Sequence, residues 1–249
     1  MLQEFISLVE RYDPEFSRKI RGASPEEIRQ LEELVGQSLP ARYRDFLAQL
    51  GKDMGGLEIE GVDLGIERII RFYESGEWTP PSGYILLGVQ GEDPCLDYYL
   101  ECTDASAQDC PIVRFPSEGA FSKENYFYPI DPSLNDFLLS LAFSEKRMES
   151  FKLQRVLMPA SSRNVQAPEI ITAPAELASI IDERAKQLGF DRVAKSSTAY
   201  RFYDQENAAL YVRYNEAAGS LGLTVAANTS KDLERISDIL SNKTSLTPA

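Results

Sequence analysis

Carboxylates are the main side chains in this sequence that could do acid–base or metal chemistry, because none of its 249 residues is a histidine. That absence excludes Ser-His-Asp and Cys-His hydrolases, and zinc sites built on imidazole. Glu92 with Asp93, or Asp97 with Glu101, could bind a divalent cation or form a glycosidase pair. On one strand, however, Asp97 and Glu101 would lie about 13 Å apart, beyond either glycosidase geometry. We therefore expect no catalytic residues, no metal and no cofactor.

The cysteines offer no second chemistry. Cys95, Cys102 and Cys110 are odd in number and are separated by six and seven residues. This spacing matches no zinc or thioredoxin pattern, so we expect free, structural thiols.

The formal net charge of -13 is unevenly distributed along the chain. Residues 1–150 hold 28 acidic and 14 basic side chains, a net charge of -14, whereas residues 151–249 hold 11 acidic and 12 basic ones, a net charge of +1. Between Arg71 and Arg114 there are 42 residues without a lysine or arginine. Such a field would repel nucleic acid and would steer a basic protein toward the surface. A solubilising surface without a partner is the alternative interpretation.

The centre of this acidic interval predicts a strand. From Cys95 to Cys102 the residues alternate, so that Leu96, Tyr98 and Leu100 face one way while acidic and tyrosine side chains face the other. We expect the second face to be polar and exposed to water. The partner-binding residues predicted on and around this strand are Glu92, Asp93, Asp97, Tyr99, Glu101, Asp104 and Asp109.

Helical periodicity and helix-start signals surround this strand. In Ser24-Pro25-Glu26-Glu27 the serine can cap a helix, the proline suits its first turn, and Glu27 completes a capping box. Leu39-Pro40 starts a second helix, which closes at Gly51. The expected helices are residues 2–12, 25–35, 41–50, 66–73 and 134–141, the last capped by Asp131-Pro132. The expected strands are residues 58–60, 84–89, 95–102, 111–115 and 126–128.

These patterns predict two α+β domains. Residues 1–150 should place helices on either side of a largely antiparallel sheet. Residues 151–168, which contain two prolines and two adjacent serines, have the composition of a linker. Residues 169–249 should form a smaller two-layer domain with the order helix, three strands, helix.

Aromatic residues leave two alternatives open. Trp78, beside Pro80-Pro81, could anchor a partner or be a partly buried core residue, and the second is the commoner case. In the second domain an aromatic and basic binding surface competes with ordinary strand packing, which we favour. The residues concerned are Tyr200, Arg201, Phe202, Tyr211, Arg213 and Tyr214.

An ordered series of segments carries a family resemblance. It runs through Gly22-Ala23-Ser24-Pro25-Glu26-Glu27-Ile28, Leu31-Glu32, Leu39-Pro40-Ala41-Arg42-Tyr43-Arg44-Asp45-Phe46-Leu47, Gly55-Gly56-Leu57, Ile85-Leu86-Leu87-Gly88, Gly91-Glu92-Asp93, Asp97-Tyr98, Pro111-Ile112-Val113 and Phe137-Leu138-Leu139. Together these segments resemble the SUKH superfamily, whose best-known members are SMI/KNR-type domains. The resemblance covers roughly residues 1–146.

The resemblance implies a binding module without catalytic activity. Members of the superfamily are mostly bacterial immunity proteins that neutralise toxins, often nucleases or deaminases, and fungal relatives are regulatory scaffolds. We therefore expect an immunity protein that blocks a basic toxin by occlusion, with a scaffold as the alternative and a carboxylate enzyme as the third hypothesis. The first residues lack a basic stretch and no apolar run nears the roughly 20 residues that span a bilayer, so we expect a soluble, cytoplasmic protein without a membrane partner.

Overall fold

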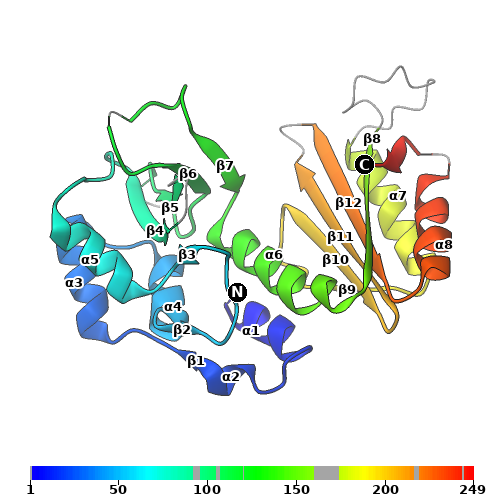
Figure 1. The fold of residues 1–249 in the computed structure, drawn as a ribbon, viewed down its shortest axis with the longest axis horizontal. Helices are drawn as coiled ribbons and strands as arrows, with labels where there is room; N and C mark the ends of the chain where they lie inside the picture. Colours follow the sequence, from blue (N-terminus) through cyan, green and yellow to red (C-terminus); the bar gives the residue numbers. More distant parts are fainter. Residues whose placement is uncertain are drawn as a thin grey trace. The chain divides into compact units, whose positions relative to one another are not determined.

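The computed structural model describes residues 2–91, 96–104, 107–119, 121–159, 174–215, 219–242 and 244–249. The chain forms two compact units, Met1–Leu141 and Ala142–Ala249, and their boundary falls within helix α6 (Leu134–Lys146). Each unit combines helices with antiparallel strands (Figure 1). The predicted α+β class is therefore confirmed.

The first unit begins with helices. They are α1 (Leu2–Glu10), α2 (Phe16–Lys19), α3 (Pro25–Val35), α4 (Ala41–Leu50) and, after two short strands, α5 (Ile66–Ser75). Helix α3 contacts both α4 and α5, and α5 contacts strand β4 (Tyr84–Gln90) (Figure 1). Helix α5 therefore lies against the sheet that carries the predicted binding strand, and α3 packs on α5.

The capping box of α3 is confirmed in both directions. The Ser24 hydroxyl accepts a hydrogen bond from the Glu27 amide at 3.2 Å, and the Glu27 carboxylate accepts one from the Ser24 amide at 2.8 Å. Gly36 ends the helix in the left-handed region, with φ 76°. Local sequence therefore specified this helix at both ends.

The sheet of the first unit is an antiparallel meander of five strands in sequence order. Its strands are β3 (Val62–Asp63), β4, β5 (Leu96–Glu101), β6 (Ile112–Pro116) and β7 (Tyr128–Asp131). A separate pair joins β1 (Ile20–Arg21) to β2 (Asp53–Met54). Every residue of β4 except Gln90 is buried, as expected of a central strand.

Three local predictions for this unit are wrong. Residues 58–60 form no strand apart from a single bridge between Ile59 and Val62, because the chain turns at Gly61 (φ 71°). The strand predicted at residues 126–128 begins at Tyr128, since Tyr126 has a φ of 57°. Asp131 is the last residue of β7, and the residue directly before α6 is Ser133. The hydroxyl of Ser133 accepts from the Asp136 amide at 3.0 Å and caps this helix.

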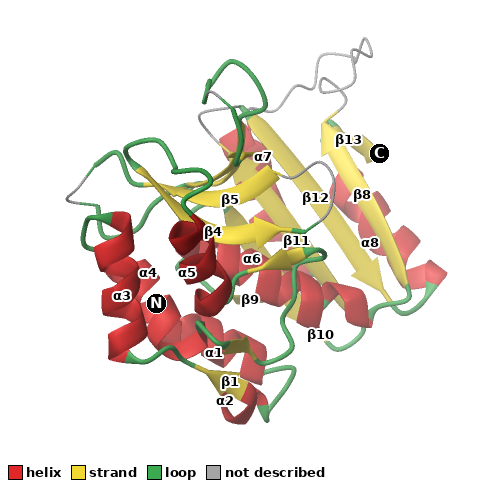
Figure 2. Ribbon diagram, turned by 60° about the vertical axis from the view of Figure 1, so that its left-hand side comes forward, coloured by secondary structure: helices red, strands yellow, loops and turns green. Residues whose placement is uncertain are grey.

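The second unit has a six-stranded antiparallel sheet in the order β13-β8-β12-β11-β10-β9. Its elements are the 3-10 turn η1 (Met148–Ser150), β8 (Leu153–Pro159), α7 (Pro174–Gln187), β9 (Asp191–Val193), β10 (Tyr200–Gln205), β11 (Ala208–Asn215), β12 (Ser220–Ala227), α8 (Ser230–Ser241) and β13 (Leu246–Pro248). The predicted helices and three-strand meander are present. Helices α7 and α8 cover one face of the sheet (Figures 1 and 2).

The predicted linker differs from the structure at its start. Residues 153–159 form β8, which pairs with β12 on one side and β13 on the other. Pairing on both sides satisfies the backbone and buries Leu157, and these partners lie far away in the sequence. Residues 160–168 of the predicted linker lie outside the described residues.

Aromatic residues of β10 and β11 pack against one another inside the second unit. Tyr200 and Phe202 are buried, and the Phe202 ring lies 4.9 Å from that of Phe143 and 5.7 Å from that of Tyr211. Among these rings, the interpretation as strand packing is therefore confirmed.

Candidate partner-binding surface

Asp97 of β5 is buried, so the prediction of a wet acidic face is wrong at this position. Its carboxylate accepts a hydrogen bond from the Gln90 amide at 2.6 Å and a second, shorter one from the Ser117 hydroxyl. Burial raises the pKa of Asp97 above its usual 3.8, although both hydrogen bonds oppose the shift. Asp97 thus tethers β5 to β4 and to the segment after β6.

The raised pKa of Asp97 predicts a specific pH dependence of stability. Because the folded state holds this proton more tightly than the unfolded state, the free energy of unfolding should fall as pH rises from the usual pKa through the raised one. Asp97→Asn should remove this part of the profile. Urea denaturation from about pH 3 to about pH 7, followed by tryptophan fluorescence, measures it.

A matched variant separates this effect from the loss of a negative charge. Asp45→Asn removes an exposed carboxylate of α4 and should keep the wild-type pH profile. An Asp97→Asn profile parallel to the wild-type one would contradict the assignment.

Tyr99 is also inside the domain. Its side chain is fully buried, and its ring stacks on that of Phe115 at a centroid distance of 3.9 Å. Its hydroxyl group forms a hydrogen bond with the hydroxyl group of Ser117. Burial raises the pKa of Tyr99 well above its usual value. Trp78, half-buried, packs 6.2 Å from the Tyr99 ring and 6.3 Å from that of Phe115. The interpretation of Trp78 as a partly buried core residue is therefore confirmed.

Two more of the predicted acids have partners within the protein. Glu101, with a side chain only 20% exposed, lies 2.5 Å from the Lys123 ammonium and accepts from the Tyr84 hydroxyl at 2.9 Å. Asp109 accepts hydrogen bonds from the amides of Leu134 at 2.9 Å and Asn135 at 3.3 Å, at the start of α6. Both carboxylates therefore make contacts that stabilise the folded domain.

The structure does not place the other three predicted residues beside Asp97, Tyr99, Glu101 and Asp109 to form one surface. Asp104 is exposed on the connection after β5, whereas Glu92 and Asp93 lie outside the described residues. The seven predicted positions therefore do not form one continuous acidic face among the residues that the structure describes.

A different acidic feature lies where β2 leads to α5. A hollow of about 480 Å³ is lined entirely by residues between Leu50 and Gly65, and we call it the acidic hollow. From Asp53 to Glu67 the chain has no lysine or arginine. The carboxylates of this segment are Asp53, Glu58, Glu60, Asp63 and Glu67, and the first, second and fourth line the hollow.

Glycines bend the chain around the acidic hollow. Gly55 has a φ of 66°, and a Cβ there would lie 2.7 Å from the Phe16 ring. After this turn Leu57 is 3% exposed and enters the core, while Glu58 faces out. The Gly55-Gly56-Leu57 sequence predicts a turn at this place, but it does not predict that the turn encloses a hollow.

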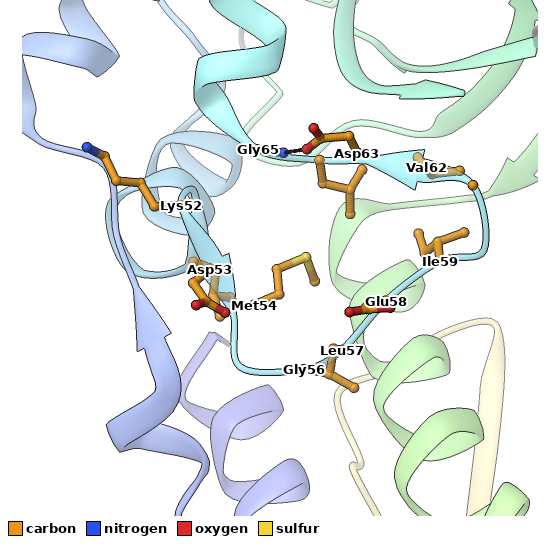
Figure 3. Close-up of a pocket in the computed structure, with 13 residues that line it drawn as sticks. Lys52, Asp53, Met54, Gly56, Leu57, Glu58, Ile59, Val62, Asp63 and Gly65 are labelled. Atoms are coloured by element: carbon orange, nitrogen blue, oxygen red, sulfur yellow. Dashed lines mark hydrogen bonds between the residues drawn. The ribbon is translucent and has the colours of Figure 1, made fainter. Parts of the chain in front are cut away.

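Figure 3 shows how the lining side chains lie. Met54 extends from β2 toward Glu58, and the Asp63 carboxylate accepts from the Gly65 amide at 2.8 Å. Within the described part of the chain, Glu58 makes no ion pair. The acidic hollow therefore offers apolar walls beside an exposed carboxylate.

Two further properties bear on the function. The described residues contain no group of three or more acidic or cysteine side chains arranged to hold a metal ion. No helix among them is both long and apolar enough to cross a membrane.

Comparison with known proteins identifies the first unit. The model of the SMI1 / KNR4 family (SUKH-1) matches residues 22–140, which run from Gly22 through the acidic hollow and the meander into α6. No curated protein matches the chain. Residues 22–140 are therefore an SMI1/KNR4 (SUKH-1) family domain.

Proposed function

We propose that this protein is a non-catalytic immunity protein that binds a basic toxin and blocks it by occlusion. The family supports a protein-binding role, because SUKH domains are commonly immunity proteins. The net charge of -14 in residues 1–150 supports a basic partner, since a toxin that acts on nucleic acid carries a positive cleft.

The acidic hollow is the proposed centre of the interface. An arginine or lysine of the partner would lay its aliphatic stem against Met54, Ile59 and Val62 and bring its charge to Glu58. This combination of apolar walls and exposed carboxylates on an SMI1/KNR4 domain is the observation that carries the proposal.

Three other predicted acids are kept in the proposed surface because of their charge. Glu92 and Asp93 follow Gly91 in the sequence and lie outside the described residues. Asp104 is exposed, but it follows the end of β5 that pairs with Tyr84, whereas the acidic hollow lies beside the other end of β4, where Gln90 pairs with Val62. Asp97 and Tyr99 are excluded because they are buried.

Co-expression tests the function. The first step is to establish whether the adjacent gene encodes a large exported protein with a toxic C-terminal domain. The chain is then produced together with that domain, and growth is expected to recover. Failure of the chain to bind or to protect against that domain would contradict the immunity role.

Charge reversal tests the surface. Glu58→Lys with Glu60→Lys should lower the association rate with the toxin about tenfold at low salt, and the difference should shrink as salt is added. Glu234→Lys with Asp238→Lys changes the net charge equally on exposed positions of α8 and should leave binding near wild type. Loss of binding only in the α8 variant would instead favour the scaffold role through the second unit.

A further inference from the structure

Cys102 and Cys110 occupy opposite positions in the hairpin formed by β5 and β6. The strands pair Leu96 with Pro116 and continue to Leu100 with Ile112. The Glu101 amide then donates to the Pro111 carbonyl at 2.9 Å, which extends the same register by one residue. The next pair in this register is Cys102 opposite Cys110.

The hydrogen bonds define what kind of pair this is. The Cys102 amide donates to the Gly83 carbonyl at 2.6 Å, toward β4 and away from β6. Cys102 and Cys110 are therefore a non-hydrogen-bonded pair, in which antiparallel strands bring Cα atoms to about 4.5 Å. That separation falls within the range that a disulfide bridges.

The two thiols are free and in contact. Both are reduced in the structure, and they share a hydrogen bond. This hydrogen bond lowers the pKa of Cys110, and together with burial it raises that of Cys102. The negative charge is therefore favoured on the Cys110 sulfur, which is the nucleophile that disulfide exchange requires.

A second hollow gives one of the sulfurs access to solvent. Cys102 is half-buried and lines a space of about 340 Å³ together with Gln37, Pro40 and Asp104, whereas Cys110 is buried. A small oxidant can therefore reach the pair from the side of Cys102, while the thiolate character lies on Cys110.

We propose that Cys102 and Cys110 form a reversible disulfide, a redox site within the SMI1/KNR4 domain that is independent of toxin binding. Two S–H bonds break and one S–S bond forms. Two protons and two electrons pass to the oxidant, so that hydrogen peroxide becomes two waters or oxidised glutathione becomes two thiols. A thiol reductant reverses the step.

The bond would strengthen a connection that supports the fold. Asp109, next to Cys110, accepts from two amides at the start of α6. Closing the segment from Cys102 to Cys110 restricts it in the unfolded chain, so the oxidised protein should unfold at a higher temperature than the reduced protein.

The test uses the full chain with Cys95→Ser, which leaves these two cysteines. After treatment with oxidised glutathione under native conditions, we expect both thiols to become unreactive toward maleimide, with a mass lower by two hydrogen atoms and one peptide linking Cys102 to Cys110. Dithiothreitol should restore both thiols, and the midpoint of thermal unfolding should fall on reduction.

Two controls make the result specific. Adding Cys110→Ser should abolish the intramolecular link, and denaturing the protein in urea should abolish the preference for it over mixed disulfides with glutathione. In the wild-type chain the link should form without Cys95. Two thiols that stay reactive in the folded protein, or a link that involves Cys95, would overturn the proposal.

Discussion

Replacing Gly22 with alanine is expected to lower the free energy of unfolding of the first unit by about 3 kcal/mol or more. A Cβ at this position would lie 1.8 Å from the carbonyl oxygen of Ala48 and 2.5 Å from its carbonyl carbon. Both contacts are with backbone, so no side-chain rotation can relieve them. The two chain segments would have to separate.

The surroundings of Gly22 resist such a separation. The neighbouring Ala23 amide donates to the Leu47 carbonyl at 2.8 Å, one residue before the clash. Phe46, Leu47 and Leu50 of α4 are all buried, so the helix cannot move without opening the core. The methyl group would therefore cost a hydrogen bond as well as packing.

Trp78, the single tryptophan, makes the measurement specific to the first unit. Its fluorescence is followed in urea for the wild type, Gly22→Ala and the control Gly91→Ala. At Gly91 a Cβ would make only an ordinary contact of 3.6 Å with the Gly61 carbonyl oxygen, so this variant should stay within about 0.5 kcal/mol of the wild type. Equal stabilities for the two variants would refute the close approach at Gly22.

The second large effect is expected at Arg147 in the second unit. Arg147→Met should lower the free energy of unfolding of that unit by about 3 to 5 kcal/mol, because it leaves the Asp204 carboxylate buried without the guanidinium. Their side chains are only 16% and 6% exposed, and Arg147 Nε lies 2.6 Å from Asp204 Oδ1. Water can therefore replace little of the lost interaction.

The arginine also holds backbone groups at the turn after β10. Its Nη2 donates to the carbonyls of Gln205 at 2.6 Å and Glu206 at 3.3 Å, and its guanidinium carbon lies 4.3 Å from the centre of the Phe151 ring. Methionine supplies an unbranched apolar side chain of similar length and removes the charge, the donors and the guanidinium contact with Phe151. The variant thus isolates the polar part of the interaction.

An exposed pair in the same unit is the matched control. Arg235 lies 3.7 Å from Asp232, with side chains 52% and 34% exposed, so Arg235→Met should cost less than about 1 kcal/mol. Unfolding is followed by far-UV circular dichroism, and the transition that Trp78 fluorescence does not report belongs to the second unit. A loss at Arg147 no greater than that at Arg235 would show that the buried pair contributes little.

Local sequence predicted the elements whose causes are local. The α3 capping box needs only Ser24, Glu27 and the backbone between them, and the position of β5 follows from its own residues, whereas the burial of both its faces does not. Strand β8 could not be predicted in this way. Its residues become a strand because β12 and β13, far along the chain, supply partners for its backbone.

The candidate surface, too, was predictable from the sequence only in part. Charge counting located the acidic excess correctly in the first part of the chain, but it treated every carboxylate as available to a partner. Asp97 binds Ser117, Glu101 binds Lys123, and Asp109 accepts hydrogen bonds from the start of α6. These partners lie 20 to 26 residues further along the chain. The acidic hollow, by contrast, comes from one continuous segment whose glycines predicted only a turn.

The sequence by itself determined the absence of histidine chemistry, the sign and location of the charge, the family resemblance and most of the helices, because each depends on composition or on neighbours along the chain. Only the tertiary structure decided which carboxylates are exposed, that Cys102 faces Cys110, and that Gly22 meets the backbone of α4. Burial and contact depend on residues that are distant in sequence, and no local pattern records which of them will cover a given side chain.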